Sequence, residues 1–152
     1  MEDIQRILVV TRSTRYCRRA IHFGISLAKK YEAKLAVLHV VHDPFNLKGW
    51  DLAMPYDESM MIEYKKIRER IRKDLSKMIR SEKTQGLDIK EFLKQGEPVN
   101  LVLKTVKQEK IDLMIMVAHH ESFFGRLFFG DFNEKIIRKM PCSIFLVKAE
   151  LS

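Results

Sequence analysis

The chain has 152 residues, enough for one domain with a hydrophobic core of its own. Its apolar fraction of 46% is ordinary for a globular protein, and no apolar run approaches the roughly 20 residues that cross a bilayer, so no membrane partner is expected. The formal net charge is +8, but aromatic residues are not interleaved with the basic ones as in a base-stacking platform, which argues against nucleic-acid binding.

The two cysteines, Cys17 and Cys142, are too few and too far apart for a disulfide framework or a zinc site. The first residues, MEDIQR, do not resemble a secretory signal. We therefore expect two reduced structural thiols and a cytoplasmic location.

The first part of the chain predicts two buried strands around a helix. Residues 4–10 end in continuous Ile, Leu and Val, and residues 34–41 are mostly apolar, which is typical of strands covered on both faces. A helix is expected between them, to about Tyr31. Residues 42–57 form a loop of unusual length, and such loops are often lids or binding segments.

A long amphipathic helix is predicted over 57–85, ended by Gly86. Apolar residues recur on it at steps of three and four, which predicts one stripe packed on the sheet rather than a cofactor site. The stripe consists of Met60, Tyr64, Ile67, Ile71, Leu75 and Met78.

The rest of the chain continues the alternation. Strands are expected over 88–93, 113–117 and 143–147. A helix with Pro98 in its first turn lies between the first two, and a helix opening at Gly130 lies between the last two. Asp131 and Glu134 stand three apart at that helix start, which resembles a capping box with Asp131 as the cap.

This pattern predicts an α/β fold with five parallel strands, helices on both faces and right-handed crossovers, in one domain over residues 1–152. Ligands of such sheets bind where the strands end. The polar residues that follow the strands are Thr11, Arg12, Ser13, Thr14 and Arg15, then His42 and Asp43, then Gln95, Gly96 and Glu97, then His119, His120, Glu121 and Ser122.

These residues do not form a catalytic set. The chain has no G-x-S-x-G elbow, so the serines are interpreted as loop or capping residues. Adjacent histidines usually point apart, so His119 and His120 are not expected to chelate a metal. Neither a P-loop nor a G-x-G-x-x-G is present. No catalytic residue and no metal site are therefore predicted.

The ordered segments resemble the universal stress protein family over essentially the whole chain. ILVVTRS resembles the opening strand and turn of the family, and AIHFGISLAKKYEAKLAVLHVV its first helix and second strand. GEPVNLVLKTVKQEKIDLMIMVAHH and GDFNEKIIRKMPCSIFLVK resemble the two later units. The resemblance implies a Rossmann-like sheet of order 3-2-1-4-5 and a homodimer.

Family members that bind ATP carry G-x-x-G, nine residues and G-[ST] after the fourth strand. Here Ala118 and Glu121 stand at the two early glycines, eight residues separate Glu121 from Gly130, and Asp131 replaces the hydroxyl residue. The stretch AHHESFFGRL instead resembles the UspA-like branch, which lacks the ATP motif. The resemblance implies a non-enzymatic stress-response protein without a cofactor, in which ATP is disfavoured.

An alternative reading is a nucleotide-binding switch with an altered phosphate loop, and a third is an ATP hydrolase. In the switch, Arg12 or Arg15 meets a phosphate together with the amides at Gly130. The candidate ligand or anion residues are Arg12, Ser13, Arg15, Val41, His119, His120, Gly130 and Asp131. Arg12 and Arg15 have two interpretations, a solubilising surface or a patch for a phosphate-bearing ligand or an acidic protein partner.

The last strand is the candidate dimer interface. It is apolar and lies at the end of an open sheet, where an unpaired strand promotes association. The resemblance points to pairing with the same strand of a second copy. The expected interface residues are Ile144, Phe145, Leu146 and Val147.

Overall fold

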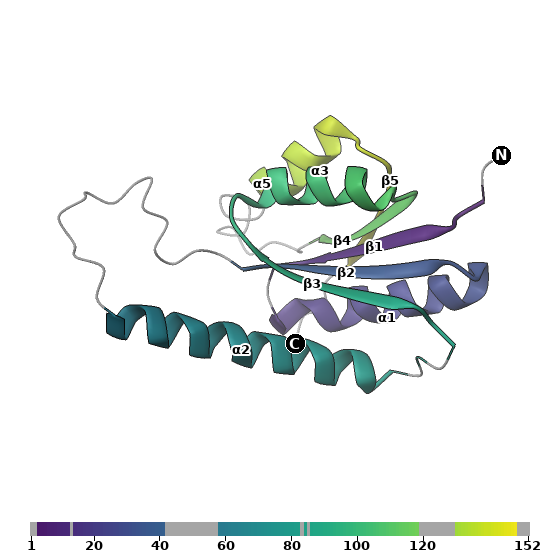
Figure 1. The fold of residues 1–152 in the computed structure, drawn as a ribbon. Helices are drawn as coiled ribbons and strands as arrows, with labels where there is room; N and C mark the ends of the chain where they lie inside the picture. Colours follow the sequence, from purple (N-terminus) through teal and green to yellow (C-terminus); the bar gives the residue numbers. More distant parts are fainter. Residues whose placement is uncertain are drawn as a thin grey trace.

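A computed structural model describes residues 3–12, 14–41, 58–82, 84, 86–118 and 130–148. The loop expected over 42–57 lies outside this part of the chain. In the described part, strands and helices alternate along the chain (Figure 1). The strands are β1 Arg6–Thr11, β2 Lys34–Val41, β3 Ile89–Gln95, β4 Leu113–Ala118 and β5 Ser143–Lys148; the helices are α1 Thr14–Tyr31, α2 Glu58–Arg80, α3 Pro98–Glu109 and α5 Gly130–Lys139.

All five strands are parallel and form one sheet of order β3-β2-β1-β4-β5, which confirms the predicted fold class and strand order. β1 lies in the middle, between β2 and β4, and all its residues from Ile7 to Thr11 are buried. The strands β3 and β5 are the two edges of the sheet.

Two apolar layers cover the two faces of the sheet. On one face, α1 and α2 pack on Ile7, Val9, Leu35 and Val37. On the other face, α3 and α5 pack on the alternate residues of the same strands. Alternate side chains of a strand point to opposite faces, so the continuous apolar runs in the sequence supply both layers.

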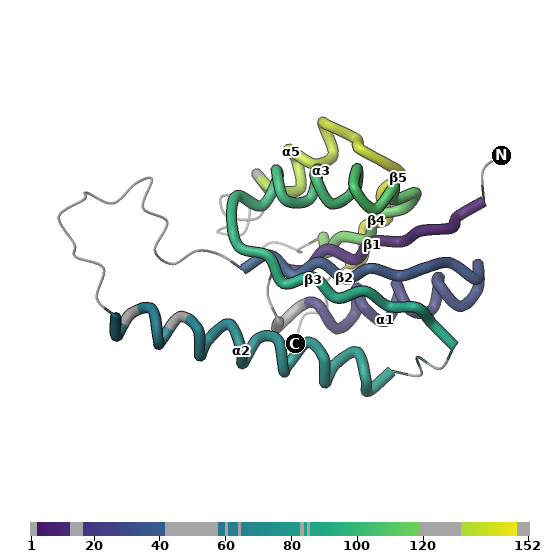
Figure 2. Tube along the Cα trace, viewed as in Figure 1, coloured from purple at the N-terminus to yellow at the C-terminus, as the bar shows by residue number. Residues whose placement is uncertain are grey.

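The first half of α2 differs from the prediction. The side chains of Met60 and Tyr64 in the predicted stripe lie outside the described part. Of the others, Leu75 is buried and Ile71 and Met78 are half-buried, but Ile67 has 45% of its surface exposed. The tube in Figure 2 shows why, because the amino-terminal half of α2 projects past the ends of the strands. The apolar stripe is therefore longer than the sheet that it covers.

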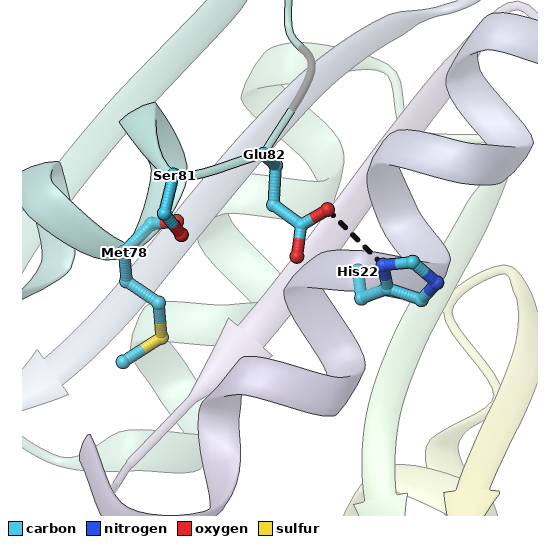
Figure 3. A network of polar contacts seen from close by, with 4 residues as sticks. All are labelled: His22, Met78, Ser81 and Glu82. Atoms are coloured by element: carbon cyan, nitrogen blue, oxygen red, sulfur yellow. Dashed lines mark hydrogen bonds and ion pairs between the residues drawn. The ribbon is translucent and has the colours of Figure 1, made fainter.

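The end of α2 also differs from the prediction. The helix ends at Arg80, because the Ser81 hydroxyl donates to the carbonyl of Met78 at 2.7 Å and satisfies a terminal acceptor. Gly86, with φ of +82°, lies in the turn before β3 and does not end the helix. Beyond this end, Glu82 meets Nδ1 of His22 on α1 at 3.1 Å, which ties the two helices together (Figure 3).

The start of α5 is a further correction. The helix begins at Gly130, so Asp131 lies inside its first turn rather than at the cap. Glu134 accepts from the Arg138 guanidinium at 2.7 Å, one turn further along the helix. The predicted first turn of α3 is confirmed, with Pro98 at its start. No helix of the described residues is long and apolar enough to span a membrane.

Candidate functional site

The sheet divides its carboxyl edge into two sides with different chemistry. Side chains alternate along β1, so Thr11 lies on the α1 side together with Val9. Arg12 lies on the side of α3 and α5 together with Val10. The two sides therefore carry different residues.

A threonine–histidine pair occupies the α1 side. Thr11 Oγ1 lies 2.7 Å from Nδ1 of His39, which pairs with it across β1 and β2. Both side chains are buried, with 2% of their surface exposed. Burial lowers the pKa of His39 to about 4, so the imidazole is neutral at neutral pH. The neutral imidazole of His39 is therefore part of the hydrophobic core.

An arginine that stacks on an aromatic ring occupies the other side. The Arg12 guanidinium carbon lies 4.5 Å from the ring centre of Phe132 on α5. Desolvation lowers the pKa of Arg12 from its ordinary value, and the charge of Glu97 opposes this effect. Arg12 therefore has both an aromatic and an acidic neighbour.

Glu97 has a structural role of its own. Its carboxylate caps α3 by accepting from the backbone amides of Val99 and Asn100, at 3.1 and 2.7 Å. A carboxylate at a helix N-terminus occupies the place where an anionic ligand would otherwise bind the amides. The start of α3 is thus closed to phosphate.

The start of α5 is anchored to the end of β4. Asn133 donates from Nδ2 to the carbonyl of Val117 at 3.1 Å. This contact holds the first turn of α5, with Gly130 and Asp131, against the carboxyl edge of the sheet.

Of the eight candidate ligand residues, the structure describes two together with their side chains and three by their backbone alone. Arg12 lies at the edge as described, and Val41 is buried at the last position of β2, on the same side as His39. Arg15, Gly130 and Asp131 lie in first turns of α1 and α5, and their side chains are outside the described part. Ser13, His119 and His120 also lie outside it. The ligand site as a whole remains a prediction.

The sequence analysis missed the roles of His39, Phe132 and Asn133. A histidine inside the apolar run KLAVLHVV was a signal for a buried polar pair. The contacts of Phe132 and Asn133 had no sequence signal, because they depend on how α5 meets β1 and β4. Among the described residues, no three His, Cys, Asp or Glu side chains gather as metal ligands do.

The edge strand β5 exposes apolar side chains on both of its faces. Phe145 points toward α1, where its ring centre lies 5.7 Å from that of Phe23, and 38% of its surface is exposed. Leu146 points the other way and is 45% exposed. Of the four predicted interface residues, Val147 is buried and Ile144 is half-buried. Phe145 and Leu146 therefore provide most of the exposed surface in this set.

This parallel sheet with helices on both faces defines a Rossmann-like α/β protein, a class whose ligands often bind at the carboxyl edge. The sequence profile of the universal stress protein family matches residues 3–148, and the chain belongs to this family. A universal stress protein of Methanothermobacter thermautotrophicus is 23% identical over 97% of this chain and 99% of its own.

Solved structures agree with this assignment. The protein MJ0577 superposes with a TM-score of 0.75 at 19% identity, over 99% of this chain and 100% of its own. A universal stress protein in complex with cAMP has a TM-score of 0.63 at 17% identity, over 96% and 98% of the two chains. One from Archaeoglobus fulgidus in complex with dAMP has a TM-score of 0.56 at 15% identity, over 99% and 100%. At these identities the likeness concerns the fold.

Proposed function

We propose that this universal stress protein is a non-enzymatic cytoplasmic homodimer that acts through protein contacts and does not bind ATP tightly. The observation that carries the proposal is the edge strand β5, with Phe145 and Leu146 exposed on opposite faces. A free strand edge bordered by apolar side chains on both faces matches what a second copy needs for strand pairing and packing.

Weak ATP binding follows from the residues in the phosphate positions. Side chains at Ala118 and Glu121 replace the glycines that let a backbone approach phosphate. Glu121 and Asp131 add negative charge, which repels phosphate by on the order of 1 kcal/mol each near solvent. Glu97 adds a carboxylate at the start of α3.

The absence of an enzymatic role follows from the chemistry of the same edge. Its described polar side chains serve as a buried pair, a stacked cation, a helix cap and an anchor to β4. The hydroxyl of Thr11 and the imidazole of His39 are the types of group that pair as nucleophile and base, but both are buried with 2% of their surface exposed, so no substrate reaches them.

Sedimentation and calorimetry test the two parts separately. We expect the wild-type protein to sediment as a dimer at micromolar concentration, and Leu146→Lys to sediment as a monomer because each dimer would gain two charges. We expect no low-micromolar binding of Mg-ATP by calorimetric titration. A monomeric wild type contradicts the interface, and tight ATP binding contradicts the ligand assignment.

A nucleotide-binding switch is the second candidate, favoured by the family structures that hold cAMP and dAMP. A nucleoside monophosphate carries less charge than ATP and needs fewer phosphate contacts, and Arg12 supplies a cation at the carboxyl edge. In this case AMP stabilises the wild-type protein against heat, and Arg12→Ala removes that stabilisation. If AMP has no effect on wild type, or an equal effect on Arg12→Ala, the switch does not use this site.

A further inference from the structure

We propose that the outer edge of β3, beside α2, binds an extended acidic segment of a partner protein by strand addition. The edge lies on the opposite side of the sheet from β5, so it is independent of the proposed homodimer. This edge has outward-facing backbone groups, a groove beside them and an excess of cations around both.

The backbone of β3 is paired on one side only. It pairs with β2, and no other described strand lies beside it. The amide of Leu35 on β2 donates to the carbonyl of Asp88, which fixes the alternation of the ladder. The groups of Lys90, Phe92 and Lys94 therefore face β2. Those of Ile89, Glu91, Leu93 and Gln95 face outward, where a further strand would pair with them, although the Leu93 carbonyl already accepts from Arg68 at 3.3 Å.

A groove of about 330 Å³ runs between this strand and α2. Its apolar walls include Val37, Leu75 and Ile79 from the sheet and the helix, and Leu93 from β3 itself. An added strand places every second side chain over α2. The groove offers those side chains an apolar floor.

The helix supplies cations along the groove. At one end of the groove the Ser76 hydroxyl donates to the Glu91 carboxylate at 3.0 Å. About two turns earlier on α2, Arg68 donates from Nη2 to the outward carbonyl of Leu93 at 3.3 Å. Arg72 lies between these contacts, lines the groove, and makes no hydrogen bond or ion pair with any described residue. The Arg68 Nε is buried without a hydrogen-bond partner among the described residues.

The other face of β3 is also basic. Lys90 and Lys94 project from it toward α3, where they meet Glu109 and Thr105 at 3.1 Å each. Around this edge the cations Arg68, Arg72, Lys90 and Lys94 outnumber the acids Glu91 and Glu109, which favours acidic side chains in a neighbouring strand. The same charges repel a second copy of β3, since like charges directly opposite destabilise a pair of strands. The occupant is therefore an acidic segment and not this chain itself.

The probe is a fluorescein-labelled peptide of alternating glutamate and valine, with the length of β3. We expect saturable binding to the full chain by fluorescence anisotropy. N-methylation of alternate peptide amides removes the backbone donors, and lysine in place of glutamate reverses the charge. We expect either change to weaken binding by about tenfold or more, equivalent to about 1.4 kcal/mol. In amide NMR spectra, we expect the peptide to shift Ile89, Glu91, Leu93 and Gln95 more than the β2-facing Lys90 and Phe92.

Arg72→Gln and Arg70→Gln form a matched pair, because both arginines are exposed on α2 but only Arg72 lines the groove. Arg72→Gln should weaken peptide binding by about tenfold, and Arg70→Gln by less than about twofold. The proposal is overturned by absence of binding, by equal binding of the N-methylated peptide, by equal effects of the two substitutions, or by amide shifts confined to β5.

Discussion

At the scale of single residues, the buried pair of Thr11 and His39 makes stability depend on pH. The unfolded chain binds a proton at His39 near pH 6.5, whereas the folded chain binds it only near pH 4. The unfolded state therefore holds more protons between these values, and stability falls as pH falls from about 6.5 to about 4. The loss approaches about 3 kcal/mol at most, since each pKa unit corresponds to about 1.4 kcal/mol.

The substitution His39→Gln tests this dependence. Glutamine keeps a polar group near Thr11 but does not titrate, so the free energy of unfolding should change less between pH 6.5 and pH 4 than in the wild-type protein. Urea unfolding at a series of pH values measures both slopes. Equal slopes would mean that another group controls acid stability.

The two thiols lead to a second prediction at this scale. Burial raises the pKa of both Cys17 and Cys142 to about 11, about two units above the ordinary value of a cysteine thiol. The thiolate is the reactive form, so alkylation of the folded protein at pH 8 should be about 100-fold slower than that of a free thiol. Mass spectrometry after iodoacetamide treatment measures the rate at each cysteine, and denaturant should restore rapid labelling. Rapid labelling of the native protein would show that the thiol is accessible and ionised.

At the scale of elements, the contact between α1 and the sheet depends on a glycine. A Cβ at Gly24 would overlap Cγ2 of Val9 and lie 3.3 Å from Cδ1 of Leu35. Overpacking costs about 1–3 kcal/mol, and alanine returns up to about 1 kcal/mol in helix propensity. We expect Gly24→Ala to lower the free energy of unfolding by about 1–2 kcal/mol.

Ser26→Ala is the control for Gly24→Ala, because Ser26 is exposed on the same helix. It gains helix propensity without a clash, so it should be neutral or slightly stabilising. Denaturant unfolding of the two variants compares them directly. If Gly24→Ala is as stable as Ser26→Ala, the helix shifts away from β1 without cost.

The order of elements could be predicted because each carries a local signal, apolar runs for the strands and a three-to-four spacing for the helices. The ends were less predictable. The last turn of α2 is set by the Ser81 hydroxyl rather than by Gly86, and α5 begins at Gly130 rather than after a cap at Asp131. Such choices depend on side-chain geometry that composition does not contain.

The candidate site was only partly predictable for a related reason. Arg12 follows a strand, so its place at the carboxyl edge could be inferred from topology. Its stacking on Phe132 could not, because that contact joins residues from opposite ends of the chain. His39 was hidden in an apolar run, and its burial appears only once β1 supplies Thr11 as a partner.

At the scale of the whole molecule, the two edges of the sheet have opposite surface chemistry. The β5 edge presents the exposed apolar residues Phe145 and Leu146, which suit an identical copy. The β3 edge presents Lys90, Lys94 and the neighbouring Arg72, which suit an acidic partner. If both proposals hold, one dimer carries two outward β3 edges, one on each subunit.

Dimerisation through β5 makes thermal stability depend on protein concentration. A dimer that unfolds to separate chains gains about 1.4 kcal/mol for each tenfold rise in concentration, so the unfolding midpoint of the wild-type protein should rise over a dilution series. Leu146→Lys should remove this dependence, because two buried charges cost the dimer several kcal/mol while the monomer keeps Leu146 at its surface. Ile62→Lys is the matched control, because Ile62 is exposed on α2, a different element from β5. This variant should keep the dependence of the unfolding midpoint on protein concentration. Scanning calorimetry over about a hundredfold range of protein concentration measures this dependence. A midpoint independent of concentration in the wild-type protein, or an equal dependence in Leu146→Lys, would place the subunit interface away from β5.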